Sequence, residues 1–253
     1  MTPSKARPSI LKTFTFENLC QGDLAKSRRF LYAHRVQEAS LFLSPLLKQP
    51  GHRAAFIERI PGVATSTDKA ETLARLQASH DQAARDLGFP HTFHAEQVHG
   101  SDLAVITSSS PTLSMNVDGL ISNETGILLG IHVADCGALY LLDQKTGAIG
   151  LLHSGKKGSE QNITGKAIAA MNENFGTDPA DLTAVLAPCI RPPQYEIDFA
   201  QSIREQAYTA GILKENYHDC ELCTASDLDR FYSYRLEKGN TGRLLALLGR
   251  TSS

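Results

Sequence analysis

The chain has 253 residues, enough for one large domain or two small ones with a proper hydrophobic core. Its 42% hydrophobic and 21% charged residues are typical of globular proteins, and a net charge of −2 argues against a nucleic-acid-binding surface. No apolar run approaches the roughly 20 residues that span a bilayer, and no signal-peptide core follows the basic N-terminus. The five cysteines indicate no disulfide framework. We therefore expect a cytoplasmic protein with reduced thiols.

Short apolar runs bounded by glycine, proline or polar clusters predict the strands of the protein. Such runs lie at Ala54–Ile60, Thr92–Val98, Leu103–Thr107, Asp118–Ser122, Leu128–His132, Ala148–Leu152, Leu182–Leu186 and Leu244–Leu248. The run at Leu128–His132 and the run at Ala148–Leu152 each lead into residues with reactive side chains.

Helices are predicted between these strands. Thr67 or Asp68 can cap a helix that runs to about Leu87, where Gly88 stands at the expected C′ position. Apolar residues recur every four positions from residue 163 to residue 175, and Gly176 then ends a second helix.

Two further helices are expected at Phe199–Ala210 and, as a short one, at Ser226–Tyr232. Strands dominate the middle of the chain and helices are interspersed, which predicts a single layered α/β or α+β domain with a mixed sheet. We place this domain at residues 54–253 and interpret residues 1–53 as an N-terminal extension packed on it.

Three residues with metal-binding side chains stand at or near predicted strand ends. Cys136 follows the Leu128–His132 run, His153 follows the Ala148–Leu152 run, and His99 lies between two earlier strands. One cysteine and two histidines suit zinc or copper and leave a fourth position for water or substrate. Alternatively, Cys136 is a nucleophile with His153 or His99 as its base. The three residues can also be ordinary packing and surface residues, since their spacing matches no short zinc pattern.

Two neighbouring features could assist such a site. Asp135 directly precedes Cys136, and the two can face one pocket only if the backbone turns there. Asp135 is then a general base, a group that orients a ligand histidine, or simply a cap of the turn. Lys156 and Lys157 precede a predicted helix, where they can hold a phosphate or carboxylate or form a solvated basic turn.

Several segments together resemble a known family, the YfiH/YlmD-type laccase-domain proteins, also called the multicopper polyphenol oxidase or purine nucleoside phosphorylase family. The resemblance runs from about Ala54 to the C-terminus. It rests on the ordered set Gln97–Gly100 (QVHG), Asp118–Ser122 (DGLIS), Ala134–Cys136 (ADC), His153–Gly158 (HSGKKG), Ala187–Ile190 (APCI), Phe231–Arg235 (FYSYR) and Thr241–Arg243 (TGR).

The resemblance implies a single layered domain of the CNF1/YfiH-like cysteine hydrolase fold, and a metalloenzyme that acts on small nucleosides and phosphate rather than on nucleic acids or membranes. It implies phosphorolysis of adenosine, inosine or methylthioadenosine, some adenosine deamination, and an older polyphenol oxidase label. It also implies His99, Cys136 and His153 as ligands of zinc, or of copper in older labels, and Arg59 as the counterpart of a family arginine. Our own hypothesis adds Asp135 and Cys136 in catalysis, and Arg59, Gln97, Lys156 and Lys157 in substrate binding.

The chain departs from the family pattern next to His153. The family motif His-x-Gly-Trp-Arg-Gly reads His-Ser-Gly-Lys-Lys-Gly here, so Lys156 stands for a tryptophan and Lys157 for an arginine. The flat packing surface and the bidentate guanidinium of the family are therefore missing. Two alternatives follow: a hydrolase or amidase with Cys136 as nucleophile, or a member that binds a metabolite without turnover.

Overall fold

The computed structural model describes residues 41–252, all of which belong to one compact unit. Residues 1–40 lie outside the described part, so the predicted N-terminal extension stays a prediction. The described strands are β1 (His52–Ile57), β2 (Phe93–Ala95), β3 (Leu103–Val105), β4 (Leu113–Ser114), β5 (Gly119–Ser122), β6 (Ile127–Val133), β7 (Gly137–Asp143), β8 (Ile149–Ser154), β9 (Leu182–Leu186), β10 (Tyr217–Asp219) and β11 (Leu244–Arg250).

These strands form two mixed sheets. The first sheet has the order β1-β11-β6-β2-β4, and the second has the order β10-β9-β7-β8-β5-β3. In the first sheet β2 runs parallel to both β4 and β6. In the second sheet β3 and β5 are parallel, while β8 runs antiparallel to β5 and β7. The predicted mixed α/β class is confirmed, with two stacked sheets instead of one.

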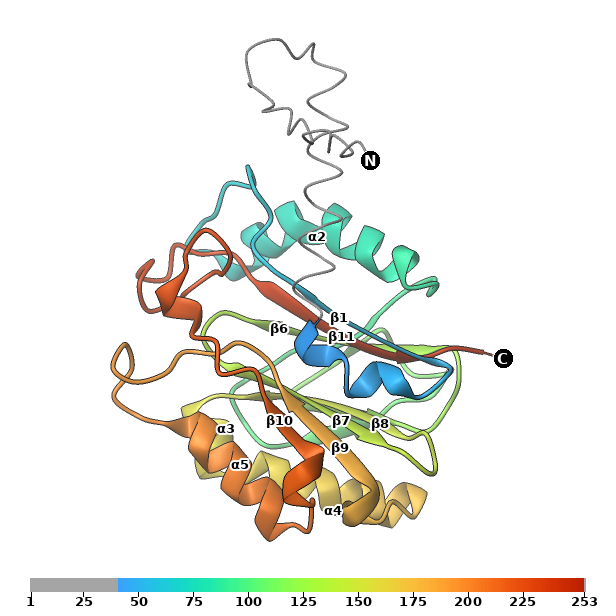
Figure 1. Ribbon diagram of the computed structural model, residues 1–253. Helices are drawn as coiled ribbons and strands as arrows, with labels where there is room; N and C mark the ends of the chain where they lie inside the picture. The colour runs from blue at the N-terminus through green and yellow to red at the C-terminus, as the bar shows by residue number, and fades with distance from the viewer. Residues whose placement is uncertain (1–40, 253) are drawn as a thin grey trace, which may run out of the picture. The chain divides into compact units, whose positions relative to one another are not determined.

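Helices cover the outer faces of the two sheets. Helix α2 (Lys69–Asp86) lies over the first sheet, and helices α3 (Lys156–Glu160), α4 (Ile163–Phe175) and α5 (Phe199–Thr209) lie under the second (Figure 1). Apolar side chains from both sheets, such as Phe56 and Tyr140, form the core between them. Both sheets are thus covered on each face, which explains why their central strands read as continuous apolar runs.

The predicted helix boundaries follow from capping. The Asp68 carboxylate accepts hydrogen bonds from the backbone amides of residues 70 and 71, and so begins α2. Gly88, which follows the C-cap Leu87 of α2, and Gly176, which follows α4 directly, both have positive φ angles, as glycines that end helices do. None of the described helices is long and apolar enough to cross a membrane.

Two sequence-based expectations were incomplete or wrong. Strand β7 was not predicted, because only three residues separate it from the apolar run of β6. The short helix expected at Ser226–Tyr232 is absent; a 3₁₀ turn at Thr224–Ser226 precedes irregular structure instead. There the Asp227 carboxylate accepts hydrogen bonds from the amides of residues 229 and 230, an arrangement that competes with helix formation.

Candidate metal centre and substrate cavity

The topology of the two sheets gathers the site at one edge. The chain crosses from the first sheet to the second three times, between β2 and β3, between β4 and β5, and between β6 and β7. The three departing strands are parallel, so all three crossings lie at the same edge. His99, Asp118 and Cys136 each lie in one crossing, and His153 is near the end of β8, which runs back to that edge.

The predicted ligands meet there. One ligand atom from each of His99, Cys136 and His153 lies within 4.8 Å of the other two. The rings of His99 and His153 are 4.9 Å apart and nearly perpendicular. His153 is buried, Cys136 is partly buried and His99 is exposed, so the group opens toward solvent on one side. Two imidazoles and a thiol fit a zinc or copper ion with one open position.

Asp118 holds this group together, and sequence reasoning missed its role. Its fully buried carboxylate accepts a hydrogen bond of 2.7 Å from His153 Nδ1. The same carboxylate accepts three backbone N–H bonds, from residues 98, 99 and 100. Burial would raise the pKa of Asp118, but the bonds from His153 and the backbone amides lower it. Asp118 therefore stays ionised and directs Nε2 of His153 toward Cys136, as carboxylates behind metal-binding histidines do.

The loop that carries His99 has an unusual backbone. Gln97 and His99 both have positive φ angles, of 63° and 62°, a conformation that costs energy for residues other than glycine. The bonds to Asp118 stabilise it at His99. At Gln97, the side-chain amide and carbonyl pair with the backbone of His132 at 2.6 and 2.9 Å. Gln97 lines the cavity described below, but its polar atoms are engaged with β6.

Gly155 leaves room for the Cys136 thiol. A Cβ atom at position 155 would lie 2.5 Å from Cys136 Sγ, a distance that real Cβ atoms do not show. The thiol thus lies directly against the backbone that follows His153. Any larger residue at position 155 would displace the sulfur from the ligand group.

The thiol and the buried imidazole influence each other. Burial would raise the pKa of Cys136, but the charge and hydrogen bond of His153, together with His99, lower it to about 6. Burial would lower the pKa of His153, but Cys136 and Asp118 raise it to about 9. A thiolate beside an imidazolium is the favoured pair, and a thiolate is the form that binds metals or attacks carbon.

Asp135 holds the turn that presents Cys136. Its φ angle is 81°, and its buried carboxylate accepts hydrogen bonds from Thr224 Oγ1 at 2.7 Å and Ser233 Oγ at 3.1 Å. The backbone amide of Arg235 donates a third bond of 2.7 Å. The backbone therefore does turn here, and Asp135 and Cys136 both line one cavity. A role for Asp135 in proton transfer stays a prediction.

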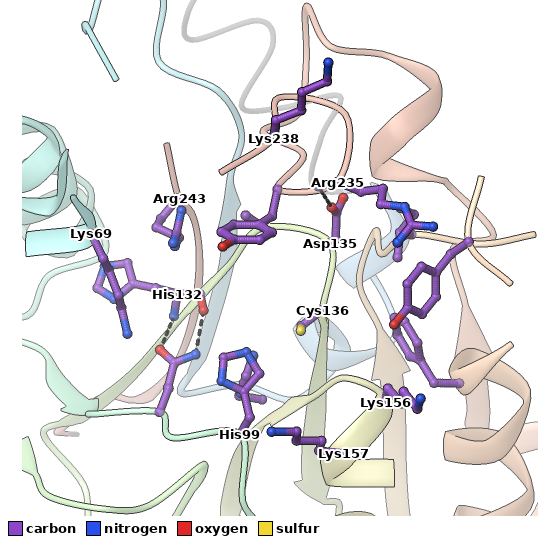
Figure 2. Close-up of a pocket in the computed structure, with 17 residues that line it drawn as sticks. Lys69, His99, His132, Asp135, Cys136, Lys156, Lys157, Arg235, Lys238 and Arg243 are labelled. Atoms are coloured by element: carbon purple, nitrogen blue, oxygen red, sulfur yellow. Dashed lines mark hydrogen bonds between the residues drawn. The ribbon is translucent and has the colours of Figure 1, made fainter. Parts of the chain in front are cut away.

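A cavity of about 670 Å³ opens in front of the ligand group, which suits a small molecule. Figure 2 shows Cys136 near its centre, with the labelled cationic side chains around it. Besides the residues already described, the lining comprises Lys69, Ala134, Lys156, Lys157, Ile190, Tyr195, Phe199, Tyr234, Arg235, Lys238 and Arg243. Lys69 and Arg243 were not among the predicted site residues, because they lie far apart in the sequence at the start of a helix and of a strand.

Of the predicted substrate-binding residues, the structure places Gln97, Lys156 and Lys157 at the cavity but not Arg59. The Arg59 guanidinium forms an ion pair of 2.8 Å with Glu237 and donates to the carbonyl of Phe231. It also stacks on the ring of Tyr232 at 4.2 Å. Arg59 thus binds the segment that supports the cavity through Nε and Nη2, and its role in holding phosphate stays a prediction.

Solved structures resemble this fold. The structure of YlmD from Geobacillus stearothermophilus superposes with a TM-score of 0.71 at 24% identity, and covers 80% of this chain and 93% of that one. The hypothetical protein YfiH from Bacillus licheniformis gives a TM-score of 0.70 at 20% identity, over 79% and 93% of the two chains. At these identities the likeness concerns the fold alone.

Sequence relatives carry one recurring name. A protein of Deinococcus radiodurans named purine nucleoside phosphorylase is 32% identical over 71% of this chain and 76% of its own length. A purine nucleoside phosphorylase of Campylobacter jejuni is 30% identical over 70% and 87%. The model of the family described as multi-copper polyphenol oxidoreductase laccase matches residues 62–201 and 194–251. This chain therefore belongs to the multi-copper polyphenol oxidoreductase laccase family.

Proposed function

We propose that this protein is a metal-dependent purine nucleoside phosphorylase, with adenosine, inosine or methylthioadenosine as its substrates and adenosine deamination as a possible side activity. The observation that carries the proposal is the convergence of His99, Cys136 and His153 at the base of a cationic, aromatic-lined cavity. The relatives named purine nucleoside phosphorylase support the substrate class.

The cavity offers what such a substrate pair needs. Tyr195, Phe199 and Tyr234 line it, and a purine can stack on flat rings of this kind. In phosphorolysis a phosphate oxygen bonds to ribose C1′, the bond from C1′ to the base nitrogen breaks, and its electron pair leaves with the purine, which takes up a proton. Cationic side chains, Lys156 and Lys157 among them, would attract the phosphate and hold it near the sugar.

His99, Cys136 and His153 would hold the metal ion, which we propose is zinc, with copper as the alternative. A zinc ion there would supply Lewis-acid polarisation of an oxygen, or a bound water of lowered pKa. Asp118 keeps Nδ1 of His153 occupied and thereby fixes which nitrogen faces the metal. Asp135 fixes the turn that directs Cys136 into the cavity. Oxidation of phenols by several coppers is disfavoured, because residues 41–252 hold only this one cluster of three such ligands.

A second candidate function is a cysteine hydrolase or amidase. Cys136, His153 and Asp118 are arranged in space as the nucleophile, base and orienting carboxylate of an activated cysteine. The pKa of Cys136 near 6 fits that role as well as it fits metal binding. The two functions differ in whether they require a metal.

The test is elemental analysis of protein purified without chelator or a metal-binding tag, with the His153→Ala variant alongside. About one zinc per chain, lost in the variant, together with phosphate-dependent release of adenine from adenosine, would support the proposal. Activity that survives metal removal but not alkylation of Cys136 would favour the hydrolase. Stabilisation by a nucleoside without product would indicate a binding protein that lacks turnover.

A further inference from the structure

The cavity is strongly cationic although the chain as a whole carries a net charge of −2. Six of its lining side chains are cationic: Lys69, Lys156, Lys157, Arg235, Lys238 and Arg243. Among the described residues, Asp135 has the only carboxylate that lines the cavity, and this carboxylate already accepts three hydrogen bonds. An excess of one charge sign in a concave site raises the local concentration of ligands of the opposite sign. The cavity therefore favours an anionic ligand.

Lys69 and Arg243 differ from the other four cations in their anchoring. Lys69 Nζ donates to the carbonyl of Glu96 at 3.2 Å, and Arg243 Nη1 donates to the carbonyl of Gly242 at 2.7 Å. Both cationic groups are thus held in place by backbone oxygens. Within the described residues neither has a carboxylate at ion-pair distance, whereas Arg235 pairs with Glu196 at 3.0 Å.

Lys69 and Arg243 also lie on the same wall of the cavity. Figure 2 shows both on one side of Cys136, with Arg235 and Lys156 on the other. Burial and the charge of Arg243 lower the pKa of Lys69, while the charges of Asp118 and Glu96 raise it. Arg243 is only partly exposed, while Lys69, Lys156 and Lys157 are exposed. Two cations on one wall, neither with a carboxylate of residues 41–252 at ion-pair distance, form an arrangement that a bound anion would stabilise.

We propose that Lys69 and Arg243 form a phosphate-binding subsite next to the metal centre. Within residues 41–252, Nε and Nη2 of the Arg243 guanidinium donate no hydrogen bond, and this pair of donors matches two oxygens of a tetrahedral oxyanion. The ammonium of Lys69 supplies a second point charge. The proposal rests on the proposed function in taking inorganic phosphate as the second substrate; a phosphate carried by a nucleotide substrate has the same chemistry.

The experiment measures anion binding apart from turnover. Isothermal titration calorimetry would follow inorganic phosphate, and separately adenosine 5′-monophosphate, into protein purified without chelator. The variants are Lys69→Met and Arg243→Lys. The second variant keeps the positive charge but loses the paired N–H donors of the guanidinium. Lys238→Met is the matched control, because Lys238 is an exposed lysine at the same cavity. Melting temperature and metal content are recorded for each variant to exclude misfolding.

We expect the Kd for phosphate to rise about tenfold or more in each of the two variants, since each loses a charge-assisted contact, and less than about twofold in Lys238→Met. In phosphorolysis assays the KM for phosphate should rise while the KM for adenosine and the metal content stay near those of the wild type. If Lys69 and Arg243 only supported the structure of the cavity, their substitution would not raise the KM for phosphate alone.

Several outcomes decide the matter. Unchanged binding of both anions in both variants, equal loss in Lys238→Met, or no binding of either anion to the wild type would overturn the subsite. Loss of monophosphate binding alone would support the subsite and assign the phosphate to the substrate. Loss of phosphate binding in a protein that releases no base from any nucleoside would leave the subsite standing and refute the proposed reaction.

Discussion

Replacing Asp118 by Asn should weaken both the fold and the metal centre. The carboxylate accepts four hydrogen bonds, two on each oxygen. An Asn oxygen can accept only one of these pairs, and the amide nitrogen would face two N–H donors. Hydrogen bonds to a charged group contribute about 1.5 to 3 kcal/mol each, so we expect a loss of about 3 to 6 kcal/mol. That is a large part of the 5 to 15 kcal/mol typical of a domain, by the same rough scale.

The metal affinity should fall as well. The uncharged amide orients His153 less firmly, and loss of such a supporting carboxylate lowers metal affinity by roughly 10- to 100-fold. Urea unfolding of the metal-free protein measures the first effect, and zinc competition with a chromophoric chelator measures the second. The Asp102→Asn variant is the control, since within the described residues the exposed Asp102 carboxylate accepts no hydrogen bond while its backbone carbonyl binds the amide of residue 118.

The reasoning would be refuted if Asp118→Asn matched Asp102→Asn in both assays. It would also fail in part if stability fell but zinc affinity did not, because His153 would then be oriented by something other than Asp118.

Three further predictions concern other parts of the structure. Gly155→Ala should abolish stoichiometric metal binding, measured by elemental analysis, because its Cβ would lie 2.5 Å from Cys136 Sγ; a variant with full metal content would show that the sulfur can move away. Tyr140→Phe should cost about 1 kcal/mol in urea unfolding, since its buried hydroxyl donates to the carbonyl of residue 55 in the other sheet; no cost would mean that water replaces the bond. Burial lowers the pKa of His80 from the ordinary value of 6.5 to about 4. As the pH falls between these values, the unfolded chain takes up a proton at His80 while the folded chain does not. The free energy of unfolding should therefore fall by up to about 3 kcal/mol as the pH drops from about 6.5 to 4. His80→Leu should flatten this part of the pH profile, and an unchanged slope would assign it to other groups.

The sequence predicted the elements with strong local signals. Helix α2 begins and ends where Asp68 and Gly88 indicated, and the strands β6, β8, β9 and β11 fall on the apolar runs. Strand β7 was missed, because its separation from β6 depends on the turn at Asp135, which tertiary hydrogen bonds create. No local pattern shows that a chain passes from one sheet to another.

The candidate site was predicted in part for the same reason. His99, Cys136 and His153 were grouped by residue type and by resemblance, and the structure brings them together. The role of Asp118 was hidden, since the sequence indicated only the first residue of a short strand at Asp118–Ser122. Lys69 and Arg243 belong to a cavity whose walls come from segments more than 170 residues apart, so no local pattern joins them. The likeness to a cysteine hydrolase fold stays a prediction.

The position of the ligands in the chain crossings has a consequence for the two layers. His99 and Cys136 each lie where the chain leaves one sheet for the other, and His153 belongs to the second sheet alone. A bound ion would therefore act as a cross-link between the layers, closing long loops in the manner of a disulfide. Metal binding would therefore also stabilise the packing of the two sheets against each other at that edge. Loading and unloading the metal would then tune the rigidity of the protein as well as its chemistry, because the four cysteines among residues 41–252 form no disulfide that could do so.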